Sequence, residues 1–313
     1  MDHFYQLPGL GTPDQPMLEA YTALGALATA TERVQLGTLV TGNTYRNPTL
    51  LAKAVTTLDV VSAGRAILGL GAGWFELEHD QLGFDFGTFT ERFDKLTEAL
   101  DIILPMLAGE RPTVNGKYYR TDQAMANPRY RDHIPLMIGG SGEKKTIPLA
   151  AAHFDHLNLI CGFDELAHKT EVARRCCEEL GRDPVTLATS VLATVVVDEN
   201  FDTAQLGERS NRTLVGSVES IAEQVQAKVL DNGVTGIVFN IPFHRPGDIT
   251  ALGEALAPLL SRRWLQRHLL APVAAGRRVG RWFDGVAGAA ALAPVAWPGA
   301  VNAAVTHATF LAQ

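Results

Sequence analysis

Apolar residues recur at spacings of three and four in several segments of the chain, a period that predicts helices with one buried face. One such stripe follows Asn47-Pro48, a pair typical of a helix N-cap with proline at the first helical position. Another follows Thr88, which makes a capping-box pattern with Glu91. Two later stripes begin at Ser217 and Asp248. We expect these apolar faces to pack into the core rather than to bind a ligand.

Short apolar runs lie between these helices, and most are too continuous for strands with one face in water. They predict a parallel sheet covered by helices, and repeated strand–helix units over this length favour an α/β TIM (β/α)8 barrel. The predicted strands are 34–40, 66–71, 134–139, 156–160, 189–197 and 234–241. Residues 1–4 are interpreted as the end of a further strand. On that interpretation the barrel lacks its first strand and helix.

Residues 74–133 are longer than a simple strand–helix connection. They contain the helix that follows Thr88 and the pair Asn115-Gly116, a strong signal for a hairpin turn. We interpret this segment as an insertion over one barrel face, of the kind that builds a lid or a pocket wall.

The composition describes a chain with ample material for a large core: 313 residues, 46% of them hydrophobic, with a net charge of −7. The negative charge argues against a nucleic-acid partner, and no apolar run reaches membrane-spanning length. The three cysteines, Cys161, Cys176 and Cys177, have no metal-ligand spacing. We therefore predict reduced thiols, a cytoplasmic protein and no metal site.

The charge changes sign near Ser261. Residues 262–313 hold six arginines, no lysine and one acid, Asp284, together with three of the four tryptophans. This tail is either a basic amphipathic extension that contacts a partner or sequence outside any compact fold. Turns at Pro272 and Pro298 favour the second interpretation. The predicted domains are thus a barrel over 1–261 and a tail over 262–313 that does not belong to it.

The run of glycines after the strand at 134–139 is the clearest candidate binding feature. It comprises Gly139, Gly140, Ser141 and Gly142, with Lys144 beside the start of the next helix. Amides at a helix start and a nearby lysine can hold a phosphate, although glycines also serve turn geometry alone. Both interpretations stay open. The dinucleotide and nucleoside-triphosphate motifs are absent.

Other candidates lie where the remaining strands end, because ligands of a barrel meet the loops at the strand carboxyl ends. His3 is the best acid–base candidate, since imidazole titrates near neutral pH, although its position alone favours a frayed terminus without a role. Gly71-Ala72-Gly73 permits either close approach of a flat ring or close helix packing. We interpret Glu76 and His79 as a solvated acidic loop rather than a metal cluster.

Together these segments resemble the bacterial luciferase-like family, specifically its deazaflavin-dependent branch that uses coenzyme F420. The resemblance runs from residue 1 to about 261 and includes 1–9, 36–48, 63–79, 89–100, 116–119, 134–146 and 236–242. It implies a TIM barrel with insertions that binds the cofactor in its mouth. The family starts upstream of Met1, so the chain is expected to be N-terminally incomplete, and an unextended barrel is expected to be unstable or inactive.

The resemblance also implies roles for single residues. A non-proline cis peptide is expected within Leu39, Val40 and Thr41, against the ring. Gly71, Ala72, Gly73 and Trp74 would flank the ring, and Gly139, Gly140, Ser141, Gly142 and Lys144 would hold the phosphate-bearing tail. His3 would donate or relay a proton during hydride transfer, with Asp2 orienting it.

The implied activity is hydride transfer between coenzyme F420 and a small organic substrate. The alternatives are an FMN-dependent luciferase-like monooxygenase and a truncated, non-catalytic flavin-binding chain. A homodimer is possible, because family members often pair. The sugar-phosphate dehydrogenases of this branch carry a glutamate where Trp74 stands here, so the resemblance does not extend to their substrate.

Overall fold

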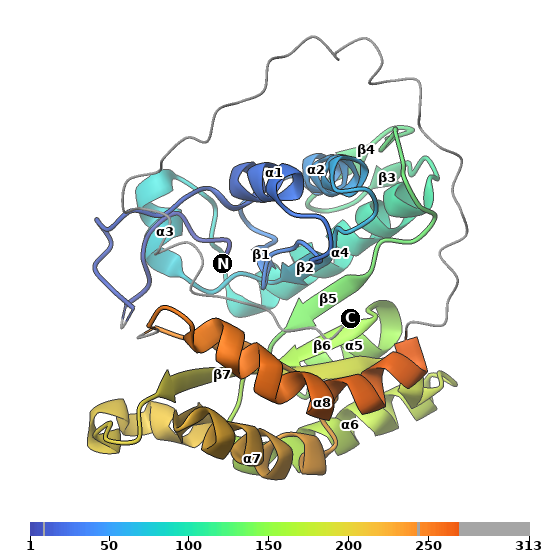
Figure 1. Cartoon of the computed structure of the whole chain (residues 1–313). Helices are drawn as coiled ribbons and strands as arrows, with labels where there is room; N and C mark the ends of the chain where they lie inside the picture. The colour runs from blue at the N-terminus through green and yellow to red at the C-terminus, as the bar shows by residue number, and fades with distance from the viewer. Residues whose placement is uncertain (9, 243–244, 269–313) are drawn as a thin grey trace, which may run out of the picture.

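The fold, in a computed structural model that describes residues 1–8, 10–242 and 245–268, is a parallel sheet wrapped by helices (Figure 1). Seven strands form the sheet, and every pairing in it is parallel. They are β1 (Thr41–Gly42), β2 (Leu68–Gly71), β5 (Leu136–Gly139), β6 (His156–Leu159), β7 (Ala188–Val197), β8 (Thr213–Gly216) and β9 (Gly236–Asn240).

The strands follow each other across the sheet as they do along the chain. The order is β1-β2-β5-β6-β7, with β9 on β7 as well, while β8 pairs only with the end of β7. Strands that follow one another along the chain and pair in parallel are typical of a barrel wall. Among the described residues no pairing joins β1 to β9, so the wall stays open between them.

The helices form as their caps predict. Asn47 accepts a hydrogen bond from the Thr49 amide at 2.9 Å, and Thr88 forms the expected capping box with Glu91. The α-helices are α1 (Ala20–Ala30), α2 (Pro48–Val61), α3 (Glu76–Leu82), α4 (Phe89–Ala108), α5 (Thr146–His153), α6 (Leu166–Glu179), α7 (Val218–Lys228) and α8 (Asp248–His268). The 3-10 helices are η1 (Phe163–Glu165), η2 (Pro184–Thr186), η3 (Thr203–Arg212) and η4 (Leu230–Asn232).

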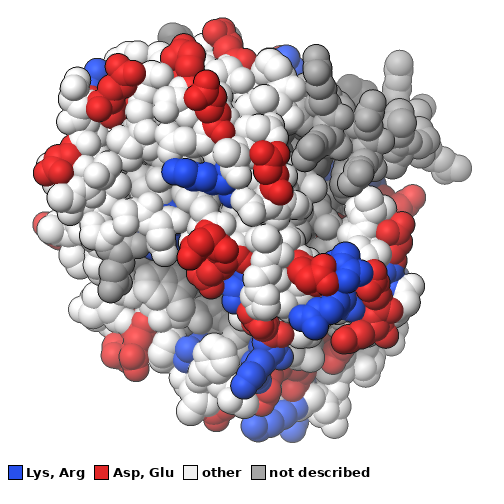
Figure 2. Space-filling model, turned by 90° about the horizontal axis from the view of Figure 1, so that it is seen from below, with Lys and Arg blue, Asp and Glu red and all other residues white. Residues whose placement is uncertain are grey.

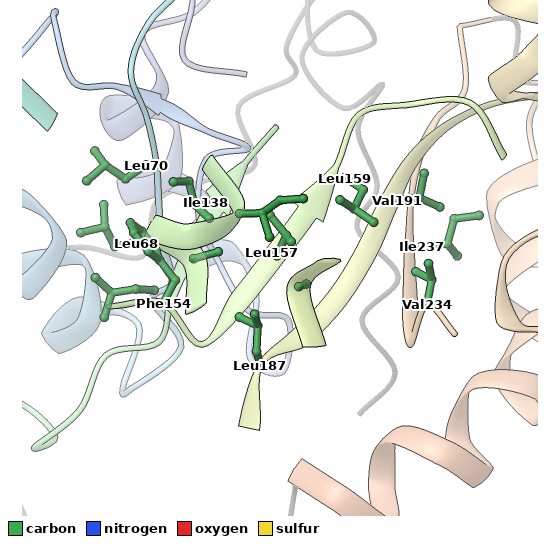
Figure 3. Close-up of a cluster of buried hydrophobic side chains, with 14 of the residues drawn as sticks. Leu68, Leu70, Ile138, Phe154, Leu157, Leu159, Leu187, Val191, Val234 and Ile237 are labelled. Carbon is green, nitrogen blue, oxygen red and sulfur yellow. The ribbon is translucent and has the colours of Figure 1, made fainter. Parts of the chain in front are cut away.

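The two faces of the sheet differ in chemistry. On the outer face, apolar side chains from neighbouring strands lie in a row and share one core with the helices (Figure 3). This row includes Leu70, Ile138, Leu157, Val191 and Ile237. Successive residues of a strand point to opposite faces, so the inner face receives the alternate positions, which are largely polar or glycine.

Several parts of the fold differ from the sequence prediction, and residues 1–4, which were expected to end a strand, form none. The apolar run 34–40 is not a regular strand: Leu36 makes a single bridge to Ala66, and β1 begins only at Thr41. Helices α1 and α6 and strand β8 were not predicted. Helix α1 is mostly alanine, threonine and small residues, and β8 has only four residues, so neither carries a strong period.

The insertion over 74–133 contains α3, α4 and the predicted hairpin, whose strands are β3 (Val114–Asn115) and β4 (Arg120–Thr121). Tyr119 of this hairpin accepts a hydrogen bond from Asn43 at the end of β1, at 3.3 Å. Helix α8 continues past the predicted boundary at Ser261 to His268. The rest of the tail lies outside the described residues, so its exclusion from the barrel remains a prediction.

Charge is mixed on the face seen in Figure 2, where acidic and basic side chains alternate without a continuous basic area. Within the described ranges, no helix is both long and apolar enough to cross a membrane. Cys161, Cys176 and Cys177 are all free thiols.

Candidate active site at the strand carboxyl ends

A single buried carboxylate, that of Glu78 on α3, fixes the N-terminal segment of the chain. Its Oε1 accepts hydrogen bonds from the amides of Phe4 at 2.6 Å and Tyr5 at 2.9 Å. Its Oε2 lies 2.8 Å from His3 Nδ1 and accepts a 2.5 Å hydrogen bond from the Tyr45 hydroxyl. The N-terminus therefore lies between α3 and β1 (Figure 1), and His3 is not on a frayed end.

The charge on Glu78 decides how His3 is protonated. Burial opposes ionisation, but the hydrogen bonds from His3 and Tyr45 outweigh it, and the net pKa of Glu78 is lowered. Burial and the bond to Glu78 raise the pKa of the Tyr45 hydroxyl. An ionised carboxylate can only accept, so His3 Nδ1 carries a proton. The second ring nitrogen, Nε2, is then left to exchange a proton with a ligand.

Asp2 does not orient His3, contrary to the expectation from the family resemblance. Its carboxylate pairs with the Arg46 guanidinium, which also binds Glu19 at 2.5 Å. Burial raises the pKa of Asp2, although Arg46 opposes that shift. The reason for the difference is geometric: adjacent residues in an extended segment point to opposite sides, so Asp2 and His3 reach different partners. The orienting carboxylate is Glu78.

A cis peptide joins Leu39 to Val40, within the range expected for it. Both side chains are partly buried, and the Val40 side chain lies against the inner face of the sheet. A methyl group added at Gly71 would stand 2.8 Å from Val40, and one added at Gly139 would stand 3.2 Å from it. Thr41, in contrast, is fully buried and hydrogen-bonded to helix α1.

The glycines of the loop after β2 serve close packing. Ala72 packs against the core, and a methyl group at Gly73 would lie 2.6 Å from the Thr44 hydroxyl. Trp74 follows them and is 61% exposed, with its ring 5.6 Å from the His3 ring and nearly perpendicular to it. Of this loop, Trp74 is thus the residue placed beside the candidate acid–base group.

The contact between Gly71 and Val40 gives a testable result. We expect Gly71→Ala to destabilise the fold by about 1–3 kcal/mol, because a stiff β-branched neighbour cannot move aside easily. Thermal unfolding measures the loss, and adding Val40→Ala to Gly71→Ala should recover part of it. Gly236→Ala is the matched control, since its added methyl group would meet only ordinary contacts of 3.5 Å or more. Equal losses in Gly71→Ala with and without Val40→Ala would contradict this packing.

Hydrogen bonds hold the glycine-rich loop after β5 in place. The Gly140 amide donates to the Asn158 carbonyl at 2.9 Å, and the Ser141 hydroxyl accepts from the Ile160 amide at 2.8 Å. The Gly142 carbonyl accepts from an amide in the first turn of α5. The loop therefore wraps the start of α5, and no side chain caps that helix.

The charges on this loop are divided. Glu143 pairs with His168 at 3.0 Å and with Lys169 at 2.7 Å, which lowers the pKa of Glu143. Lys145 lies over the Phe93 ring. Lys144 is exposed and makes no ion pair with any residue the structure describes. Lys144 is thus the loop's available cation, and its neighbour Glu143 is already neutralised by two partners.

The segment 76–79 is not the solvated loop that the sequence suggested. It opens helix α3, and Glu78 and His79 are completely buried. His79 bonds to the Phe75 carbonyl at 2.8 Å and to the Thr44 hydroxyl at 2.7 Å. The described part of the chain holds no cluster suited to a metal ion. Sequence reasoning missed this burial because three of these four residues are acidic or polar. Such a composition resembles a surface loop whichever way its side chains point.

Sequence reasoning gave no role to a polar group on the inner face of the sheet. Ser190 Oγ lies 2.8 Å from His156 Nε2 and accepts from Asn158 Nδ2 at 2.7 Å. Asn158 is fully buried, and its Oδ1 has no hydrogen-bond partner among the described residues. A buried acceptor normally has a donor. A ring N–H of a flavin-type cofactor is one donor of suitable chemistry, so the inner face fits such a group.

Comparison with known proteins places this geometry among enzymes. A family model described as luciferase-like monooxygenase matches residues 3–207. An F420-dependent glucose-6-phosphate dehydrogenase of Microbacterium testaceum is 41% identical over 124 residues, or 39% of this chain and 37% of that protein. The chain thus matches less than two-fifths of that relative. The pyrimidine monooxygenase RutA of Cronobacter sakazakii is 24% identical over 79% of this chain and 85% of that protein.

Solved structures share the architecture. An F420-dependent secondary alcohol dehydrogenase, solved with an F420–acetone adduct, superposes with a TM-score of 0.71 over 82% of this chain and 88% of that chain. An EDTA monooxygenase from Chelativorans superposes with a TM-score of 0.68. The identities are 18% and 13%, so these likenesses concern the fold. They confirm the α/β barrel type predicted from the sequence.

Proposed function

We propose, from the premise that the chain belongs to the luciferase-like monooxygenase family, that it is an oxidoreductase using coenzyme F420. It would transfer a hydride between that deazaflavin and a small organic substrate. The observation that carries the proposal is the His3–Glu78 pair beside the exposed Trp74, at the carboxyl end of β2. The F420-dependent relatives favour the deazaflavin.

The cofactor would supply the hydride, and the chain would hold and orient it. The Leu39–Val40 peptide and the partly exposed Val40 side chain would support the deazaflavin ring from the inner face of the sheet. The free Asn158 Oδ1 would accept a ring N–H. The loop from Gly139 to Lys144 would hold the phosphate-bearing tail.

His3 would move the proton that accompanies the hydride. The ionised Glu78 fixes Nδ1–H, so Nε2 is the nitrogen that gives a proton to the substrate or takes one from it. Glu78 itself lies completely buried and touches neither partner of the reaction. Its role is to position the ring.

A second candidate is a monooxygenase that uses FMN. It is favoured by one observation: the monooxygenase RutA aligns over 79% of this chain, a longer stretch than the dehydrogenase does. Both candidates place the flavin-type ring at the same strand ends and differ in the cofactor tail.

Titration of the whole chain with F420 and with FMN, followed by ring fluorescence, tests the proposal. We expect saturable binding of F420 at least tenfold tighter than that of FMN. Lys144→Ala should weaken F420 binding severalfold at low salt by removing a charge from the phosphate site. Lys117→Ala is the control, since Lys117 is an exposed lysine of the hairpin. Tighter binding of FMN would favour the monooxygenase, and binding of neither would favour a non-catalytic chain.

A further inference from the structure

Trp74 holds an unusual position for a large aromatic residue. Its ring is 61% exposed, yet it stands edge-on to His3 at 5.6 Å and tilted against Phe75 at 5.2 Å. The two glycines before it are held by packing, and Gly73 has a left-handed backbone with φ +83°. The indole is therefore presented at a fixed place beside the proton-carrying ring rather than buried in the core.

The charged groups around Trp74 and His3 are already engaged. The Arg46 guanidinium binds Asp2 and Glu19. The Arg92 guanidinium donates to the carbonyls of Gly73 and Gly87 and stacks on the ring of Phe86. Across the described ranges, neither of these cations is left to hold a phosphate or carboxylate of a substrate.

The other rings packed near His3 are aromatic as well, beginning with Phe75 at 5.7 Å from the His3 ring. Phe4 stacks on Phe84 with ring centroids 5.7 Å apart and meets Tyr45 at 5.1 Å. The Tyr45 hydroxyl donates its hydrogen bond to Glu78. Rings of this kind favour apolar and aromatic molecules, which gain both burial and ring–ring contact.

We propose that Trp74 is the substrate platform of this site, and that it selects an uncharged, flat compound with an aromatic ring next to its carbonyl or alcohol group. Phosphorylated sugars and carboxylates are disfavoured, because among the described residues the two cations near Trp74 and His3, Arg46 and Arg92, are already engaged. The inference rests on the proposed function for the reaction. The binding preference follows from the aromatic side chains near His3 and from the engagement of the nearby cations.

Calorimetric titration of the whole chain with 1-naphthaldehyde and with glucose 6-phosphate tests the preference, first without and then with saturating F420. We expect naphthaldehyde to bind in both conditions and glucose 6-phosphate to bind at least tenfold more weakly. Trp74→Ala should weaken naphthaldehyde binding about tenfold, which corresponds to about 1.4 kcal/mol. Trp74→Phe should restore most of it. Phe89→Ala removes another exposed aromatic residue and should have no effect.

The outcomes separate the two proposals. Tighter binding of glucose 6-phosphate, no naphthaldehyde binding with F420 present, or equal affinities in wild type and Trp74→Ala would each overturn the role of Trp74. Failure of F420 to bind, together with Trp74-dependent binding of naphthaldehyde, would overturn the proposed function and leave the aromatic platform supported.

Discussion

Replacement of Glu78 by alanine is expected to lower the stability of the fold by about 3–5 kcal/mol, because it leaves several buried donors without an acceptor. Two of these are the amides of Phe4 and Tyr5, and two are the side chains of His3 and Tyr45. For a domain of this size the melting temperature should fall by on the order of 10 °C. Limited proteolysis should then cleave the first residues, which the carboxylate holds in place.

The matched control is Glu76→Ala, which removes an exposed carboxylate two residues away on the same helix. It should change stability by no more than about 0.5 kcal/mol. The loss of stability in Glu78→Gln should lie between the two. Its side-chain oxygen still accepts hydrogen bonds, whereas its NH2 group would face other donors. If Glu78→Ala melts like Glu76→Ala, the carboxylate does not anchor the N-terminal segment.

Acid pH gives a second readout of the same carboxylate. The folded pKa of Glu78 lies below its ordinary value of 4.5. Its ionisation therefore stabilises the fold fully above pH 4.5, and that stabilisation is lost as the pH falls through the lower, folded pKa. Glu78→Gln cannot titrate, so its stability should fall less steeply in this acid range than that of the wild type.

Replacement of His3 by alanine should lower turnover about 100- to 10,000-fold while leaving F420 affinity within about threefold, if the proposed function holds. The reason is that His3 Nε2 is the group left open to exchange a proton, whereas the cofactor would be held chiefly by the Leu39–Val40 segment before β1 and by the loop after β5. Stopped-flow measurement of F420 oxidation or reduction gives the rate, and fluorescence titration gives the affinity.

His133→Ala is the control for this substitution. His133 is exposed and pairs with Asp155 at 3.0 Å, just before β5 and so at the opposite ends of the strands. It should leave turnover unchanged. A His3→Ala enzyme with full turnover would show that the proton comes from elsewhere, and a variant that loses cofactor and turnover together would point to a binding role instead.

The candidate site was only partly readable from the sequence. His3 and the loops at 71–74 and 139–144 could be named because they stand at predicted strand ends, and strand ends of a barrel converge. Glu78 could not, because its hydrogen-bond partners lie 33 to 75 positions away along the chain. The partner of Asp2 was misassigned for a related reason: Arg46 lies 44 residues away.

What the sequence determined is therefore local. Asn47 and Thr88 cap the helices that follow them, and the apolar runs from Leu68 onward form strands in chain order, because these preferences depend on near neighbours and on burial of continuous apolar faces. Only the tertiary structure decided that Val40 fills the space above Gly71 and Gly139, and that Glu78 gathers donors from two distant segments. Such contacts depend on how whole elements pack together, and no short stretch of sequence specifies that packing.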